Sequence, residues 1–137
     1  MIEERYPEEN KAGKVEAKII LGRCPNALSK TENLYGIRIQ KFGSDWFRTW
    51  AFKIDAERAH KEGYDREITT GSFRPVESYP GCPYCGSTNI AKCCCGKSFC
   101  FKMPEYHAEH IRLTCPWCGQ SGMYNAAERL DLQGGGF

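Results

Sequence analysis

The sequence predicts a small α+β protein in which an antiparallel N-terminal sheet module is followed by a cysteine-rich β domain. Two observations lead to this fold class. Apolar and polar residues alternate along residues 35–40, and an aromatic-rich run follows at residues 46–54, which is the pattern of paired strands. Eight of the nine cysteines fall between residues 82 and 118, so the composition changes sharply along the chain.

The module is expected to span residues 14–73, after a flexible lead-in at residues 1–13. Residues 14–21 (KVEAKIIL) fit a strand or a short helix, and a strand is favoured because Gly22 and Pro25 end the apolar run early. Residues 35–40 and 46–54 flank a turn at residues 43–45 and predict a hairpin. Trp50 and Phe52 lie on one face of a regular strand, so we expect both inside as the aromatic core.

A short helix and a further strand complete the module. Asp55 is expected to cap a helix over residues 56–62, which Gly63 ends. Residues 67–73 (EITTGSF) are expected to add a strand. A module of about 60 residues is close to the lower size limit for a self-supporting core.

The C-terminal part is bounded by segments that favour irregular structure. Residues 74–81 (RPVESYPG) contain two prolines and a glycine and are interpreted as a linker. Residues 82–128 are expected to form the cysteine-rich domain. Residues 129–137 contain three consecutive glycines and are expected to be a flexible tail.

Two matched CPxCG segments, residues 82–86 and 115–119, predict a metal site. Two cysteines in this spacing can turn both sulfurs toward one ion, and the glycine that follows allows a positive φ. Neither copy has the βαβ context of a redox-active CxxC pair. The pattern therefore indicates a zinc-ribbon-like domain that binds at least one Zn²⁺. The expected ligands are Cys82, Cys85, Cys115 and Cys118.

The residues between the two segments leave a second zinc site open. Its candidate ligands are Cys93, Cys95, Cys100 and His107, while the alternatives are buried thiols and surface histidines. Cys94 points away from its neighbours on a regular strand. The two CPxCG segments are expected to share one ion because their symmetry matches a ribbon, although an interleaved cross-brace stays open. Cys24 is interpreted as a free structural thiol.

These cysteines carry a resemblance to a known family. Residues 79–119, with YPGCPYCG, CCCGKSFC and TCPWCG, resemble the TerY-C domain. That domain is a metal-binding module at the end of TerY-type von Willebrand factor A proteins of bacterial tellurite-resistance and stress systems. The resemblance implies metal binding and a setting in such a complex. The residues before Tyr79 do not fit a von Willebrand A domain.

Several protein classes are disfavoured. A closed all-cysteine site activates water poorly, and no HExxH, GxSxG or P-loop motif occurs, so we expect a non-enzyme. The acidic, polar N-terminus lacks the features of a signal peptide, and no run of about 18 apolar residues occurs. We therefore expect a cytoplasmic protein without a membrane partner.

The leading functional hypothesis is an adaptor that binds other proteins. The first alternative is nucleic-acid binding, because cations and aromatics interleave between residues 35 and 53. The candidate residues are Arg38, Lys41, Arg48 and Trp46, although the formal net charge is only +2. The second alternative is thiol-based handling of metals or oxyanions, with Cys94 as the reactive group.

Overall fold

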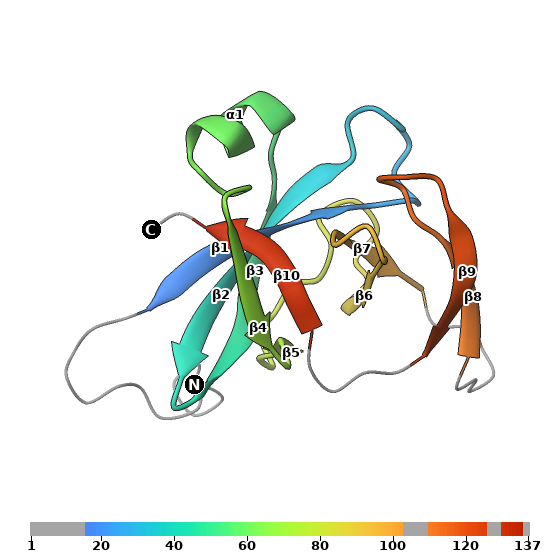
Figure 1. The fold of residues 1–137 in the computed structure, drawn as a ribbon. Coiled ribbons are helices and arrows are strands. Elements are labelled where there is room, and N and C mark those ends of the chain that lie inside the picture. The colour runs from blue at the N-terminus through green and yellow to red at the C-terminus, as the bar shows by residue number, and fades with distance from the viewer. Residues whose placement is uncertain (1–15, 103–109, 126–129, 136–137) are drawn as a thin grey trace.

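The structure is a computed structural model that describes residues 16–102, 110–125 and 130–135. Over these ranges the chain forms ten strands and a single six-residue helix, α1 (Ala56–Lys61) (Figure 1). The strands are β1 (Ala17–Arg23), β2 (Leu34–Phe42), β3 (Asp45–Lys53), β4 (Glu67–Gly71), β5 (Arg74–Pro75), β6 (Asn89–Lys92), β7 (Ser98–Phe101), β8 (His110–Thr114), β9 (Ser121–Asn125) and β10 (Leu130–Gly135). The α+β prediction is therefore wrong, and the fold is mostly β.

One mixed sheet joins strands from both ends of the chain. Its order is β4-β10-β1-β2-β3-β5, and β7 pairs in parallel with the end of β1 while also pairing with β6. Strands on both sides of residues 74–81 thus share this sheet. Residues 130–135, expected in a flexible tail, form β10 between β1 and β4. The lead-in at residues 1–13 lies outside the described residues.

The burial of β1 explains why the N-terminal strands do not form a separate sheet. Four consecutive residues of β1, from Ile19 to Gly22, are buried, which is typical of a central strand rather than an edge. One edge of β1 pairs with β2, and β10 and β7 cover its other edge. Later strands therefore complete the environment that this apolar run requires.

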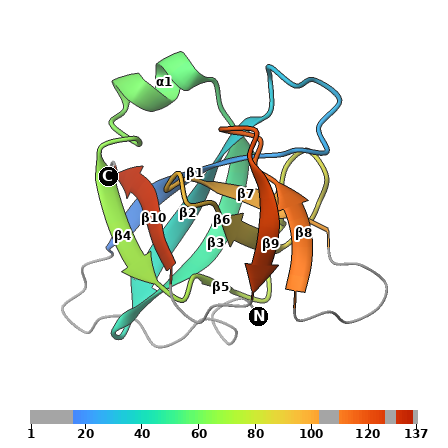
Figure 2. The ribbon, with the colours of Figure 1, turned by 45° about the vertical axis from the view of Figure 1, so that its right-hand side comes forward.

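A second, two-stranded sheet contains β8 and β9. In Figures 1 and 2 this hairpin stands beside β6 and β7. Within the described residues its strands pair only with each other. An isolated two-stranded hairpin is at best marginally stable in water, so other interactions must hold this one in place.

A bulge in β3 changes which aromatic residues are buried. Arg38 pairs with Trp50 and Ile39 pairs with Arg48, so Thr49 is an extra residue in β3. The inward positions shift there, from Trp46 and Arg48 before the bulge to Ala51 after it. Trp50 is consequently 54% exposed, and Phe52 is only half-buried. The prediction that both form the aromatic core was wrong.

The two tryptophans of β3 should therefore differ in their effect on stability. Trp46 is 7% exposed, so Trp46→Ala is expected to lower the free energy of unfolding by about 3–5 kcal/mol. Trp50→Ala should change it by less than about 1 kcal/mol, because Trp50 lies largely in solvent. Chemical denaturation of both variants measures the difference. Equal losses would contradict the register of the bulge.

Candidate metal centres

Eight cysteines gather in two clusters of four. Within each cluster, the four Sγ atoms all lie within 4.8 Å of one another. We call them the core site (Cys24, Cys82, Cys85 and Cys100) and the hairpin site (Cys93, Cys95, Cys115 and Cys118). The core site belongs to the main apolar core, where its cysteines pack with Tyr35, Ile37 and Phe73. The hairpin site lies where β8 and β9 meet the turn between β6 and β7.

Each CPxCG segment forms the same tight turn. In the first turn, the Gly86 amide donates to the Cys82 carbonyl at 2.7 Å, and the Tyr84 amide donates to the Cys82 sulfur at 3.4 Å. The second turn repeats both bonds. The Gly119 amide donates to the Cys115 carbonyl at 2.8 Å, and the Trp117 amide donates to the Cys115 sulfur at 3.4 Å. Both glycines have a positive φ, near 79°, as the sequence predicted.

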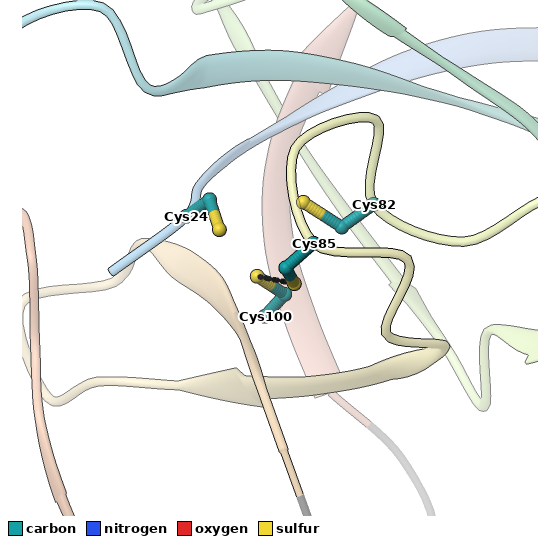
Figure 3. Close-up of side chains that lie close together, drawn as sticks. All are labelled: Cys24, Cys82, Cys85 and Cys100. Atoms are coloured by element: carbon teal, nitrogen blue, oxygen red, sulfur yellow. Dashed lines mark hydrogen bonds between the residues drawn. The ribbon is translucent and has the colours of Figure 1, made fainter. Parts of the chain in front are cut away.

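Strand pairing supplies the other two sulfurs of the core site. β1 and β7 run in parallel, with Gly22 opposite Ser98 and Arg23 opposite Phe99. The next residue in each segment is a cysteine, Cys24 directly after β1 and Cys100 within β7, so this register brings the two together. Figure 3 shows all four sulfurs converging between β7 and the first CPxCG turn. Three segments of the chain therefore meet at this site.

A shorter turn supplies the other two sulfurs of the hairpin site. It connects β6 and β7, with the Gly96 amide donating to the Cys93 carbonyl at 2.9 Å and the Cys93 amide donating to the Lys97 carbonyl at 3.0 Å. Cys93 and Cys95 lie in this turn, and the second CPxCG turn connects β8 to β9. The hairpin site thus joins the two-stranded sheet to the main sheet.

An aromatic residue at the same position in each turn fastens it to the main sheet. The Tyr84 hydroxyl donates to the Leu34 carbonyl at 2.7 Å. The Trp117 indole N–H donates to the Ser98 carbonyl at 2.6 Å, and the Arg23 guanidinium lies 4.5 Å from the centre of the Trp117 ring. Both turns are thereby held against the main sheet by contacts other than their sulfurs.

The thiols of each cluster differ in pKa because their hydrogen bonds and their burial differ. A hydrogen bond with the Cys100 thiol lowers the pKa of Cys82 to about 5, whereas burial raises the pKa of Cys24 to about 11. In the hairpin site, a backbone amide bond lowers the pKa of Cys93 to about 6, and burial raises that of Cys115 to about 12. A bound cation would stabilise all four thiols of a cluster in their deprotonated form.

The spacing of the sulfurs fits a tetrahedral metal ion. A Zn–S bond of about 2.3 Å places the sulfurs of a tetrahedron about 3.8 Å apart. The Sγ atoms of Cys85 and Cys100 are 3.6 Å apart, and those of Cys95 and Cys115 are 3.8 Å apart. Four sulfurs complete a tetrahedron, so each cluster fits a closed site with a structural role.

The structure divides the expected ligands differently from the prediction. It does not bring the two CPxCG segments together: Cys82 and Cys85 lie with Cys24 and Cys100, while Cys115 and Cys118 lie with Cys93 and Cys95. The shared-ion pairing is thereby corrected. Cys94 stays outside both clusters, as expected, and is exposed. His107, a candidate ligand, lies outside the described residues.

Cys24 is the functional residue that the sequence analysis missed. The sequence analysis interprets it as a free structural thiol, and it lies 58 positions before Cys82, the next cysteine. The number of cysteines could have indicated that Cys24 is a ligand. Without Cys94, the nine cysteines leave eight, which is enough for two tetrahedral sites. Proline also follows Cys24, as it follows Cys82 and Cys115.

The residues considered for nucleic acid do not form one exposed surface. Arg48 is buried, and its guanidinium donates to the carbonyls of Phe73 and Thr88, each at 2.6 Å. Trp46 is also buried, while Arg38 and Lys41 are partly exposed. Arg48 therefore bonds to the segment before the first CPxCG turn and to the segment after it.

Comparison with known proteins identifies one family. A family model described as the TerY-C metal binding domain matches residues 48–135, which confirms the resemblance found in the sequence. Cys24 lies outside this match, while the other seven clustered cysteines lie inside it. No curated protein matches the chain. No solved structure matches it either.

Proposed function

The chain belongs to the TerY-C metal-binding domain family, and from this premise we propose that it is a zinc-stabilised, non-enzymatic adaptor that binds other proteins. The two closed clusters of four cysteines carry this proposal. Each one ties together segments that are distant in sequence, which is the role of a structural metal rather than a catalytic one. The ions would fix a surface on which a partner can dock.

Zinc is the proposed ion because of the ligand type and geometry. Four thiolates in a tetrahedron select Zn²⁺ or an iron–sulfur centre rather than the hard cations Mg²⁺ and Ca²⁺. Zn²⁺ requires no redox partner and tolerates buried all-sulfur sites. We propose one ion in each cluster.

Exposed apolar side chains support a role in protein binding. Leu28 is fully exposed, and Trp50, Ile68 and Met123 are more than half exposed. Leu28 lines a surface cavity of about 640 Å³ together with Leu34, Ile54, Lys53 and Tyr84. The first CPxCG turn thus contributes Tyr84 to this cavity, which links the core site to the surface we propose for partner binding.

The family resemblance suggests in which kind of complex the protein acts. We propose that the partner belongs to a bacterial stress-response or tellurite-resistance complex in the cytoplasm. In the described part of the chain, no helix is long and apolar enough to cross a membrane.

Affinity purification from the source cells tests the adaptor function. The wild-type chain should retain a protein partner, and Leu28→Glu should lose it, because the change puts a charge at the exposed edge of the cavity. Ile68→Glu, at an exposed residue that does not line this cavity, is the matched control and should retain the partner. Recovery of nucleic acid in place of protein would contradict the proposal.

The nucleic-acid alternative receives less support. The burial of Arg48 and Trp46 removes two of its four candidate contacts from the surface. Proteins that bind single strands need a cationic groove with aromatic rings open to the bases.

A further inference from the structure

The two clusters differ in their access to solvent. In the core site Cys24, Cys82 and Cys100 are buried, and Cys85 is half-buried. In the hairpin site Cys95 and Cys118 are exposed. Both sites consist of four cysteines and contain one CPxCG turn, so their exposure can be compared at matched positions.

One pair of sulfurs in each cluster allows a direct comparison of exposure. Cys85 and Cys118 occupy the same position in their CPxCG turns. The Sγ of Cys85 lies 3.6 Å from that of Cys100, and the Sγ of Cys118 lies 3.6 Å from that of Cys93. The distances are equal, but only Cys118 is exposed. A reagent in solution therefore reaches one of these pairs more easily than the other.

We propose that the hairpin site is an oxidation site, in which a peroxide converts Cys93 and Cys118 to a disulfide while the core site stays intact. Thiolate character and exposure determine the oxidation of cysteine, and a metal-bound thiol is already deprotonated. The inference rests on the metal sites of the proposed function but not on the identity of any partner.

The chemistry balances with one peroxide. The Cys118 thiolate attacks the peroxide, forming an S–O bond and breaking the O–O bond, and one hydroxide leaves. The Cys93 thiolate then attacks the Cys118 sulfur, forming the S–S bond and releasing a second hydroxide. Two thiolates lose two electrons in total, and one peroxide is reduced to two hydroxides, which the buffer protonates to water.

Oxidation would change the structure locally. A disulfide needs about 2.0 Å between the two sulfurs, and it removes two of the four ligands of the site. The ion would then leave, and β8–β9 would lose one of its attachments to the turn between β6 and β7. The main sheet does not depend on this ion, because its strands pair with one another and contain the core site.

Hydrogen peroxide added to the zinc-loaded Cys94→Ser protein tests this inference. This variant removes the exposed cysteine that belongs to neither cluster, so every remaining thiol is a proposed ligand. We expect one of two zinc ions to leave at least about tenfold faster than the other, as read by a chromophoric chelator. Peptide mapping should locate the disulfide at Cys93 and Cys118, and a reductant with added zinc should restore the bound ion.

Other results would overturn the inference. They are equal release of both ions, release of neither, a disulfide between Cys85 and Cys100, or a reaction that requires Cys94. A second variant, Cys118→Ser, should hold only the core ion and release almost none in the same period. Fewer than two ions in the untreated protein would instead refute the two-ion proposal itself, so the two failures are distinguishable.

Discussion

Replacing Cys24 with serine is expected to remove the ion of the core site and to unfold the main sheet. Serine supplies a hard, weakly acidic oxygen where the ion needs a thiolate. Binding of a structural zinc contributes on the order of 10 kcal/mol to folding. The whole free energy of unfolding of a domain is about 5–15 kcal/mol, so the loss is comparable to the entire stability.

Metal analysis and amide spectra of Cys24→Ser measure this effect. Cys94→Ser is the matched control, because it removes a thiol without removing a ligand, and it should keep both ions and its spectrum. A Cys24→Ser protein that still binds two ions would show that Cys24 is the free thiol that the sequence analysis expected.

Replacing Cys118 with serine is expected to have a large but local effect. The ion of the hairpin site should be lost, and β8–β9 should lose its protection from hydrogen exchange, because a hairpin of two strands is marginal alone. The contacts of Trp117 with Ser98 and Arg23 remain but do not replace an ion. The main sheet should keep its protection.

The corresponding change in the other turn is the natural comparison. Cys85→Ser removes the core ion and should expose amides of β1 and β7 to exchange, whereas Cys118→Ser should leave these amides protected. Hydrogen exchange read by mass spectrometry separates the two patterns. Identical patterns for the two variants would mean that both turns hold one shared ion, as the sequence first suggested.

Local features were predictable from the sequence where local physics determines them. Alternation predicted the hairpin that the structure forms as β2 and β3, and Asp55 caps α1 by accepting from the Arg58 amide at 2.7 Å. The positive φ of Gly86 and Gly119 followed from the CPxCG pattern. Each of these depends on residues within a few positions of one another.

Long-range features were not predictable in the same way. Nothing local to β1 shows that β10 and β7 will pair with it, although its run of buried residues requires partners on both edges. The bulge at Thr49 shifts the pairing by one residue, and this alone moves Trp50 from the expected core to the surface. Alternation along a sequence does not reveal such a shift.

The predicted assignment of the cysteines to metal sites was wrong for a related reason. The similarity of the two CPxCG turns suggested that they share an ion, but similar turns need only form similar half-sites. The β1–β7 register determines that Cys24 and Cys100 complete the first half-site. This pairing joins residues more than 70 positions apart, and it lies partly outside the segment that the family model matches.

Native mass spectrometry of the purified wild-type protein, without added metal, tests the central claim most directly. Two separate clusters predict a mass that corresponds to two zinc ions per chain, and a brief alkylation under the same conditions should modify Cys94 first. A chain that carries a single ion at full occupancy, or iron alone, or no metal with its nine thiols intact, would contradict the account.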